Sequence, residues 1–134
     1  MRSKPCLTAS DARIIAAACR ALAERNNWAV TIAVVDDGGH LMHLERLDAK
    51  VTTVNVAAGK ARTSALLHAP SAGLAARIKD EPNLLALDVM PLRGGVPIMV
   101  GKECVGGVGV SGVIPEQDEQ VAKAGIAALL GEQS

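Results

Sequence analysis

Residues 94–113 contain the feature that most restricts the fold of this chain, a strand-forming segment lined with glycine. Two runs rich in β-branched residues flank a turn at residues 101–103, a pattern that predicts a β-hairpin. Glycine weakens a strand unless a bulge, or the close approach of a ligand or another chain, requires the missing side chain. We therefore expect the backbone of the second strand to be approached closely.

The same segment contains Gly107, Gly109 and Gly112 with the spacing of a dinucleotide-binding fingerprint. That fingerprint needs its glycines in the turn between a strand and a helix, with phosphate at the helix N-terminus. Here the glycines lie within the strand. The next helix begins with acidic residues, which would repel phosphate. Nucleotide binding is therefore not expected.

Hydrophobic periodicity divides the rest of the chain into helices and strands. Helices are predicted at residues 11–25, 48–67 and 116–130, with a shorter helix beginning near residue 70 and a helical turn after residue 81, and strands at 28–35 and 41–47. Thr8 or Ser10 is expected to cap the first helix, and Asp48 the second. The element order α-β-β-α-α-β-β-α predicts an α+β fold in which helices cover an antiparallel sheet made from two hairpins.

Composition limits the classes of function. The chain has 134 residues, which fit one domain spanning 1–134, and its only aromatic residue of the Phe, Tyr and Trp type is Trp28. Its 14 basic and 14 acidic residues balance, so neither charge nor stacking surface indicates nucleic-acid binding. No segment indicates a signal peptide or a membrane span, and three widely spaced cysteines indicate the reducing cytoplasm.

Five motifs occur in an order and spacing that resemble the GlcG/HbpS-like heme-binding family, which includes the C-terminal domain of PduO-type proteins. They are DDGGH at 36–40, ERLD at 45–48, AxxKART at 57–63, GGVPI at 94–98 and VGGVGVSG at 105–112. The resemblance covers residues 7 to 131. It implies a profilin-like or PAS-like domain and a homo-oligomer. For some members it also implies binding of heme or a corrinoid, and for others catabolism of unsaturated carboxylates.

The candidate ligand-binding residues are Lys60 and the loop before the second hairpin. Lys60 shares a helical stripe with small or polar residues, where it either binds a carboxylate or lies in solvent. Substituting it by methionine is expected to weaken ligand binding and leave the fold intact. Arg93 can anchor an anion, and turn glycines can present backbone N–H groups to it. The predicted binding set is Lys60, Arg93, Gly94, Gly95, Val96 and Pro97.

His40 and Arg46 join Lys60 as catalytic candidates if the protein is an enzyme. His40 and His43 point to opposite faces of a strand, so they cannot chelate one metal ion, and no metal site is expected. Cys104 is expected to be a small buried hydrophobic residue in preference to a heme ligand.

Two functions remain from the sequence. The first is a cytoplasmic homo-oligomer that binds a small anionic ligand, with heme or another tetrapyrrole as the leading ligand. The second is a cofactor-free isomerase, deaminase or hydrolase that acts on a small unsaturated carboxylate, as in aromatic catabolism. A Soret band would distinguish the first from the second.

Overall fold

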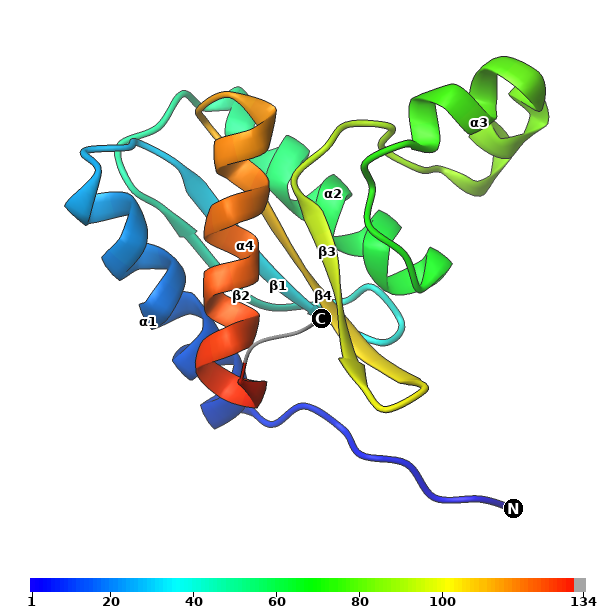
Figure 1. The fold of residues 1–134 in the computed structure, drawn as a ribbon, viewed down its shortest axis with the longest axis horizontal. Helices are drawn as coiled ribbons and strands as arrows, with labels where there is room; N and C mark the ends of the chain where they lie inside the picture. Colours follow the sequence, from blue (N-terminus) through cyan, green and yellow to red (C-terminus); the bar gives the residue numbers. More distant parts are fainter. Residues whose placement is uncertain (132–134) are drawn as a thin grey trace.

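The computed structural model describes residues 1–131, in which four strands form one antiparallel sheet (Figure 1). The strand order is β2-β1-β4-β3, and both predicted hairpins are present. The last three residues of the predicted domain lie outside the described part. The strands are β1 (Thr31–Asp36), β2 (Leu41–Arg46), β3 (Gly95–Val100) and β4 (Glu103–Ser111).

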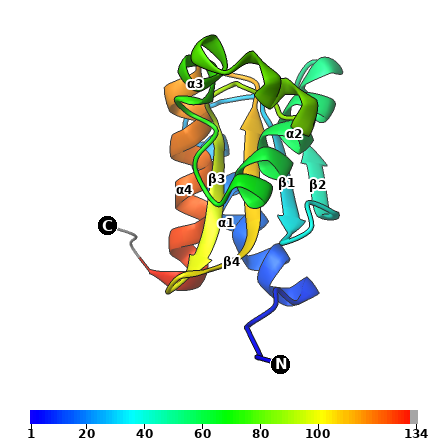
Figure 2. The same ribbon diagram turned by 90° about the vertical axis from the view of Figure 1, so that its right-hand side faces the viewer.

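Helices cover both faces of the sheet, which confirms the predicted α+β fold and the predicted order of elements. α1 (Ala9–Arg25) and α4 (Pro115–Leu130) lie side by side on one face, and α2 (Thr52–Leu67) lies on the other (Figures 1 and 2). α3 (Leu74–Asp80) and the short 3-10 helix η1 (Pro82–Leu87) project beyond the sheet. Among residues 1–131, no helix is long and apolar enough to cross a membrane.

The face under α1 and α4 contains the larger hydrophobic core. Its side chains are branched residues of the strands packed against alanine, isoleucine, valine and cysteine of the two helices. Ile15, Cys19, Ile32, Val34, Ile98, Val108, Val110 and Val121 are fully buried in it.

The face under α2 is built differently: glycines of β4, together with Ala33 and Val35 of β1, meet alanines of the helix. A Cβ atom on Gly109 would overlap the Ala57 carbonyl oxygen, and one on Gly107 would lie 2.6 Å from Ser64 Oγ. The predicted close approach to β4 is therefore present. The approaching segment is helix α2 of the same chain, neither a ligand nor another chain, and its alanine face packs closely on the glycines of β4.

The predicted N-cap residue is correct for α1 and wrong for α2. Thr8 caps α1 as expected, in a capping box with Asp11. The prediction for Asp48 is wrong, because α2 begins four residues later and its N-cap residue Val51 makes no side-chain hydrogen bond. Asp48 instead has the left-handed backbone conformation, with φ of 56°. The chain between β2 and α2 thus turns before the helix begins.

Candidate functional site

Lys60 lies on the face of α2 that packs against the sheet and is only 3% exposed. Its ammonium donates hydrogen bonds to the Val110 carbonyl oxygen at 2.9 Å and to Asp118 Oδ2 at 3.1 Å. Asp118 belongs to α4, on the other face of the sheet, so the contact joins the two helical layers. Neither charge could be buried here alone, because an unpaired charge in a protein interior is strongly destabilising.

The carboxylate of Asp118 accepts hydrogen bonds from two partners. Its Oδ1 accepts a hydrogen bond from the Val113 N–H at 3.1 Å, while Oδ2 faces Lys60. Burial raises the pKa of Asp118, although the Val113 N–H and the Lys60 ammonium act in the opposite direction. The carboxylate of Asp118 is therefore almost inaccessible to water, and its pKa depends on the neighbouring ammonium of Lys60.

Gly94 makes room for this ion pair. Its φ is 128°, and a Cβ atom there would lie 2.8 Å from Lys60 Nζ and 3.1 Å from Asp118 Cβ. The structure therefore brings Lys60 and the glycine loop together, as expected. The Gly95 N–H donates to Ser71 Oγ at 2.8 Å, and Val96 packs into the core under α1 and α4.

Backbone groups of this loop are already bonded within the chain, unlike those of an open anion-binding loop. The Gly94 carbonyl oxygen accepts from the Val110 N–H at 3.1 Å, the Gly95 N–H is already bonded, and Pro97 has no N–H. A binding role for these residues stays a prediction. In the structure their contacts are made within the chain.

Arg93 lies at the surface above the buried pair. Its guanidinium contacts Glu119 at 3.2 Å and Glu116 at 3.4 Å. The pKa of Glu119 is lowered: burial alone would raise it, and the hydrogen bonds from Arg93 and Lys123 outweigh that effect. The charge of Arg93 is therefore shared with carboxylates of α4, which fixes the loop against that helix.

A cavity of about 390 Å³ lies beside this cluster and reaches Glu119. It is mainly apolar, and within residues 1–131 the guanidinium of Arg77 has no hydrogen-bond or ion-pair partner. The cavity thus combines apolar walls with one uncommitted positive charge. Its lining residues are Leu67, Ala69, Pro70, Ala72, Gly73, Leu74, Arg77 and Glu119.

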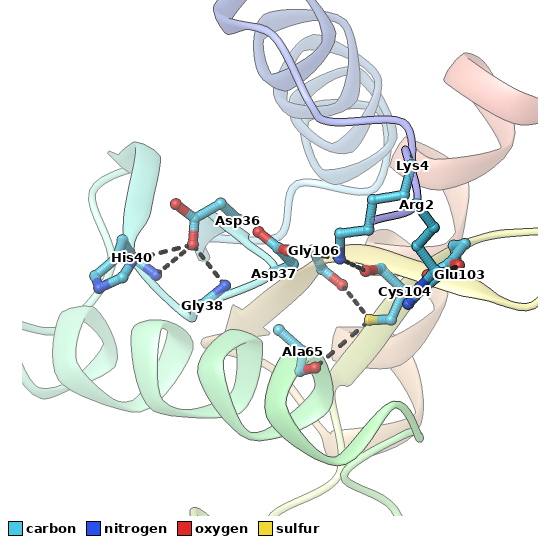
Figure 3. Close-up of polar contacts among 10 residues, drawn as sticks. All are labelled: Arg2, Lys4, Asp36, Asp37, Gly38, His40, Ala65, Glu103, Cys104 and Gly106. Carbon is cyan, nitrogen blue, oxygen red and sulfur yellow. Dashed lines mark hydrogen bonds and ion pairs between the residues drawn. The ribbon is translucent and has the colours of Figure 1, made fainter.

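The three catalytic candidates do not meet. His40 precedes the first residue of β2 and Arg46 is its last residue, so they lie at opposite ends of that strand. The side chain of His40 is 81% exposed and contacts Asp36 Oδ1 at 3.2 Å (Figure 3). Lys60 is buried beside Asp118. The structure therefore does not assemble a site from His40, Arg46 and Lys60.

Cys104 lies near the end of the sheet where the β1–β2 turn and the N-terminal segment meet (Figure 3). It is 2% exposed, its thiol contacts the carbonyl oxygens of Ala65 and Gly106, and burial raises its pKa. Lys4 closes this end by contacting Asp37 at 2.7 Å. These contacts are those expected of a small buried residue. Within residues 1–131, no group of three or more His, Cys, Asp or Glu residues could hold a metal ion.

Sequence reasoning missed Asp118, Ser71 and Arg77. A signal for Asp118 was present, because it lies three and four residues before Val121 and Ala122 on the buried face of α4. An acidic residue on an apolar helical stripe needs a buried partner, and Lys60 lies on a similar stripe of α2. Pairing the buried acidic residue of α4 with the buried lysine of α2 would have predicted the contact between Asp118 and Lys60.

The fold and the site define a small α+β protein in which a glycine-lined antiparallel sheet separates two helical layers. Residues 7–127 match the family model described as haem degrading protein HbpS-like. Protein GlcG of Escherichia coli strain K12 is 40% identical over 114 residues, which cover 83% of this chain and 85% of that protein. The chain therefore belongs to the HbpS-like family.

Solved structures agree with this assignment. A double mutant of Streptomyces reticuli HbpS is 33% identical with a TM-score of 0.90, covering 96% of this chain and 90% of that chain. The heme complex of PduOC has a TM-score of 0.87 at 24% identity, covering 96% of this chain and 100% of that chain. At this identity the second similarity concerns the fold.

Proposed function

We propose that this protein is a cytoplasmic homo-oligomer that binds a small, largely apolar, carboxylate-bearing ligand, with heme or another tetrapyrrole as the leading ligand. The observation that carries the proposal is the apolar cavity beside the Arg93–Glu119 contact, with the unpaired guanidinium of Arg77 among its lining residues. Membership in a family described as haem degrading supports the choice of heme.

The lining residues fit the outer parts of such a ligand. Leu67 and Pro70 offer apolar surface to a macrocycle, and the guanidinium of Arg77 suits a propionate. None of the lining residues carries an imidazole, thiol, thioether or phenol that could ligate iron. His68 is exposed and caps the end of α2, and it is not among the lining residues. When bound, heme would supply redox and ligand-binding chemistry at its iron.

We assign Lys60, Arg93, Gly94, Gly95, Val96 and Pro97 a supporting part in this site. Lys60 and Asp118 lock α2 to α4, and Arg93 holds the loop onto Glu119, which lines the cavity. In this proposal the charged residues shape the wall that the ligand meets. Arg77 is the cation that meets the ligand's acid group.

Exposed apolar side chains support the proposed homo-oligomer. They occur on the edge strand β2 and on the projecting segment around η1, where no residue of η1 is buried. Apolar surface of this kind is commonly covered by a second subunit. The exposed residues in these two places are Leu41, Leu44, Leu85, Leu87 and Leu92.

Hemin titration tests the proposal. Adding hemin to the purified protein is expected to produce a saturable Soret band shifted from that of free hemin. A protein that leaves the hemin spectrum unchanged would refute the heme assignment. In that case the cofactor-free enzyme of small carboxylates would take its place, with catalytic residues other than a joint set of His40, Arg46 and Lys60.

A further inference from the structure

The two edge strands of the sheet, β2 and β3, differ in how their outer edges are covered. At β3, the outer backbone of Gly95 is bonded to Ser71: its N–H donates to Ser71 Oγ at 2.8 Å, and its carbonyl oxygen accepts from the Ser71 N–H at 3.0 Å. Two residues further along, Pro97 has no N–H to donate. A bulge between Ile98 and Met99 also interrupts the strand. An edge closed in these ways is protected from pairing with another strand.

The outer edge of β2 is open over its second half. Its register with β1 continues to Leu47, whose N–H donates to the Val30 carbonyl oxygen at 2.8 Å. Because bonded and non-bonded pairs alternate along antiparallel strands, the N–H and carbonyl groups of Leu44 and Arg46 point away from β1. Within residues 1–131 no other segment bonds these groups, and β2 is the outermost strand on its side of the sheet (Figure 2). The bulge of β2 lies at Met42, nearer the hairpin turn.

The exposed side chains of this edge lie on the face of the sheet that α2 covers further in. Leu44 pairs with Ala33, whose side chain belongs to the cluster under α2, so Leu44 shares that face. Leu44 is 39% exposed and Leu41 is 55% exposed. The strand contains no lysine and no proline, two residues that commonly protect an edge. The edge of β2 is therefore a template for another strand.

We propose that β2 pairs antiparallel with β2 of a second copy of this chain, so that the two sheets become one across a two-fold axis. This inference rests on the proposed homo-oligomer and names the surface through which it forms. A two-fold axis sets the same strand of two copies side by side in opposite directions. Centred on Leu44, the pairing bonds the Leu44 N–H of each copy to the Leu44 carbonyl oxygen of the other. The two exposed leucines then cover each other.

Charge favours this register over the neighbouring ones. Within one chain His43 and Glu45 lie on the same face of β2, with His43 Nε2 4.0 Å from Glu45 Oε1. Pairing centred on Leu44 sets His43 of each copy opposite Glu45 of the other, where an imidazole N–H can donate to a carboxylate. Centring the pairing on Glu45 or on Arg46 would set like charges directly opposite, which is destabilising. The edge is thus self-complementary about Leu44.

Sedimentation equilibrium of the full chain tests the pairing with two matched variants. Leu44→Lys sets two like charges opposite each other at the axis, so it is expected to raise the dissociation constant of the assembly at least about tenfold. Leu66→Lys, at a position of α2 that is also 39% exposed, is expected to keep the wild-type constant. Equal constants for Leu44→Lys and wild type would overturn the proposal. A monomeric wild type would overturn it together with the proposed homo-oligomer.

Hydrogen exchange of the Leu44 amide tests the backbone contact itself. In the assembled wild type this N–H is expected to exchange at least about tenfold more slowly than after dilution to the monomer, because it donates to the second copy. An assembled protein whose Leu44 amide exchanges as fast as in the monomer would overturn the β2 pairing and leave the homo-oligomer to another surface. Neither measurement contains hemin, so both are independent of the tetrapyrrole proposal.

Discussion

At the scale of single residues, Lys60 and Asp118 make a buried contact between the two helical layers. The pair is buried on both sides, with side-chain exposures of 4% and 3%. A buried ion pair adds little net stability, because desolvation offsets the attraction, yet removing one partner leaves an uncompensated charge. The expectation that Lys60→Met leaves the fold intact is therefore corrected by the burial of Lys60.

We predict that Lys60→Met lowers the free energy of unfolding by about 3–5 kcal/mol, because it leaves Asp118 charged, buried and unpaired. The matched variant Lys60→Met with Asp118→Asn should recover much of this loss. Its neutral amide needs no counter-charge and can still accept from the Val113 N–H. Urea denaturation of both variants measures the difference. Wild-type stability of the single variant would show that the ion pair is unimportant.

The same variant has a predicted pH dependence. Burial already raises the pKa of Asp118 above its ordinary 3.8, and losing the Lys60 charge raises it further. The native state then binds a proton more tightly than the unfolded state, so stability increases as pH falls through the raised pKa. The deficit of Lys60→Met should shrink in acid, and this pH dependence should be absent from the double variant, in which residue 118 does not titrate. A deficit independent of pH would contradict this assignment.

The cysteines are predicted to differ in reactivity. Burial raises the pKa of the Cys19 thiol to about 12 and also raises that of Cys104, whereas Cys6 is exposed. Since the thiolate is the reactive form, only Cys6 should react with Ellman's reagent in the native protein at about pH 8. All three thiols should react after denaturation. Rapid modification of two or three native thiols would contradict the described core.

At the scale of elements, the packing of α2 on β4 explains the glycine-lined strand. Alanine on the helix and glycine on the strand let the two backbones approach closely, which suits dispersion contacts over a large area. The sequence predicted that β4 would be approached but could not identify the neighbour. The spacing of the glycines shows only where side chains are missing and does not say which segment packs there. Alanine faces are common on helices, so the alanines of α2 did not identify it as the neighbour.

Gly109→Ala tests this packing. A Cβ atom there would overlap the Ala57 carbonyl oxygen and lie 2.5 Å from the Ala61 nitrogen, so α2 must move. We expect the free energy of unfolding to fall by about 1–3 kcal/mol or more. Gly101→Asn is the control, because Gly101 has open space around it and asparagine tolerates its positive φ. Equal melting temperatures for the two variants would show that the close packing is incidental.

Other elements were predictable to different degrees. The helices, both hairpins and the buried strand β1 followed from periodicity and turn residues, since these signals are local. The beginning of α2 did not, because Asp48 is a good capping residue whose left-handed backbone is set by the connection from β2. The capping preference of Asp48 was therefore overridden by the backbone conformation that the connection from β2 requires.

At the scale of the whole molecule, the cavity could not be predicted from sequence. Seven of its lining residues fall between Leu67 and Arg77, but the eighth is Glu119 of α4. Only the folded arrangement, with Arg93 contacting Glu119 and Lys60 contacting Asp118, brings α4 to this place. The sequence analysis singled out Lys60 and Arg93, which contact Asp118 and Glu119 of α4, and it missed the lining residue Arg77.

The exposed leucines predict self-association of the whole molecule. Leu41 is 55% exposed on an edge strand, and Leu85 and Leu87 are 54% and 53% exposed on η1. Burying these surfaces between subunits would stabilise an assembly through the hydrophobic effect. Sedimentation velocity at micromolar concentration is expected to show an oligomer. A stable monomer would refute the proposed assembly without affecting the fold.

The most direct test of the proposed function is the affinity for hemin of wild type, Arg77→Met and Arg13→Met, measured from the Soret band. Within residues 1–131, Arg77 is the charged lining residue whose side chain has no partner, so Arg77→Met should lower the affinity at least about tenfold, equivalent to about 1.4 kcal/mol. Arg13→Met, at an exposed position on α1 outside the cavity, should bind as wild type does. Absence of a Soret shift in wild type, or equal affinity of all three proteins, would contradict the account.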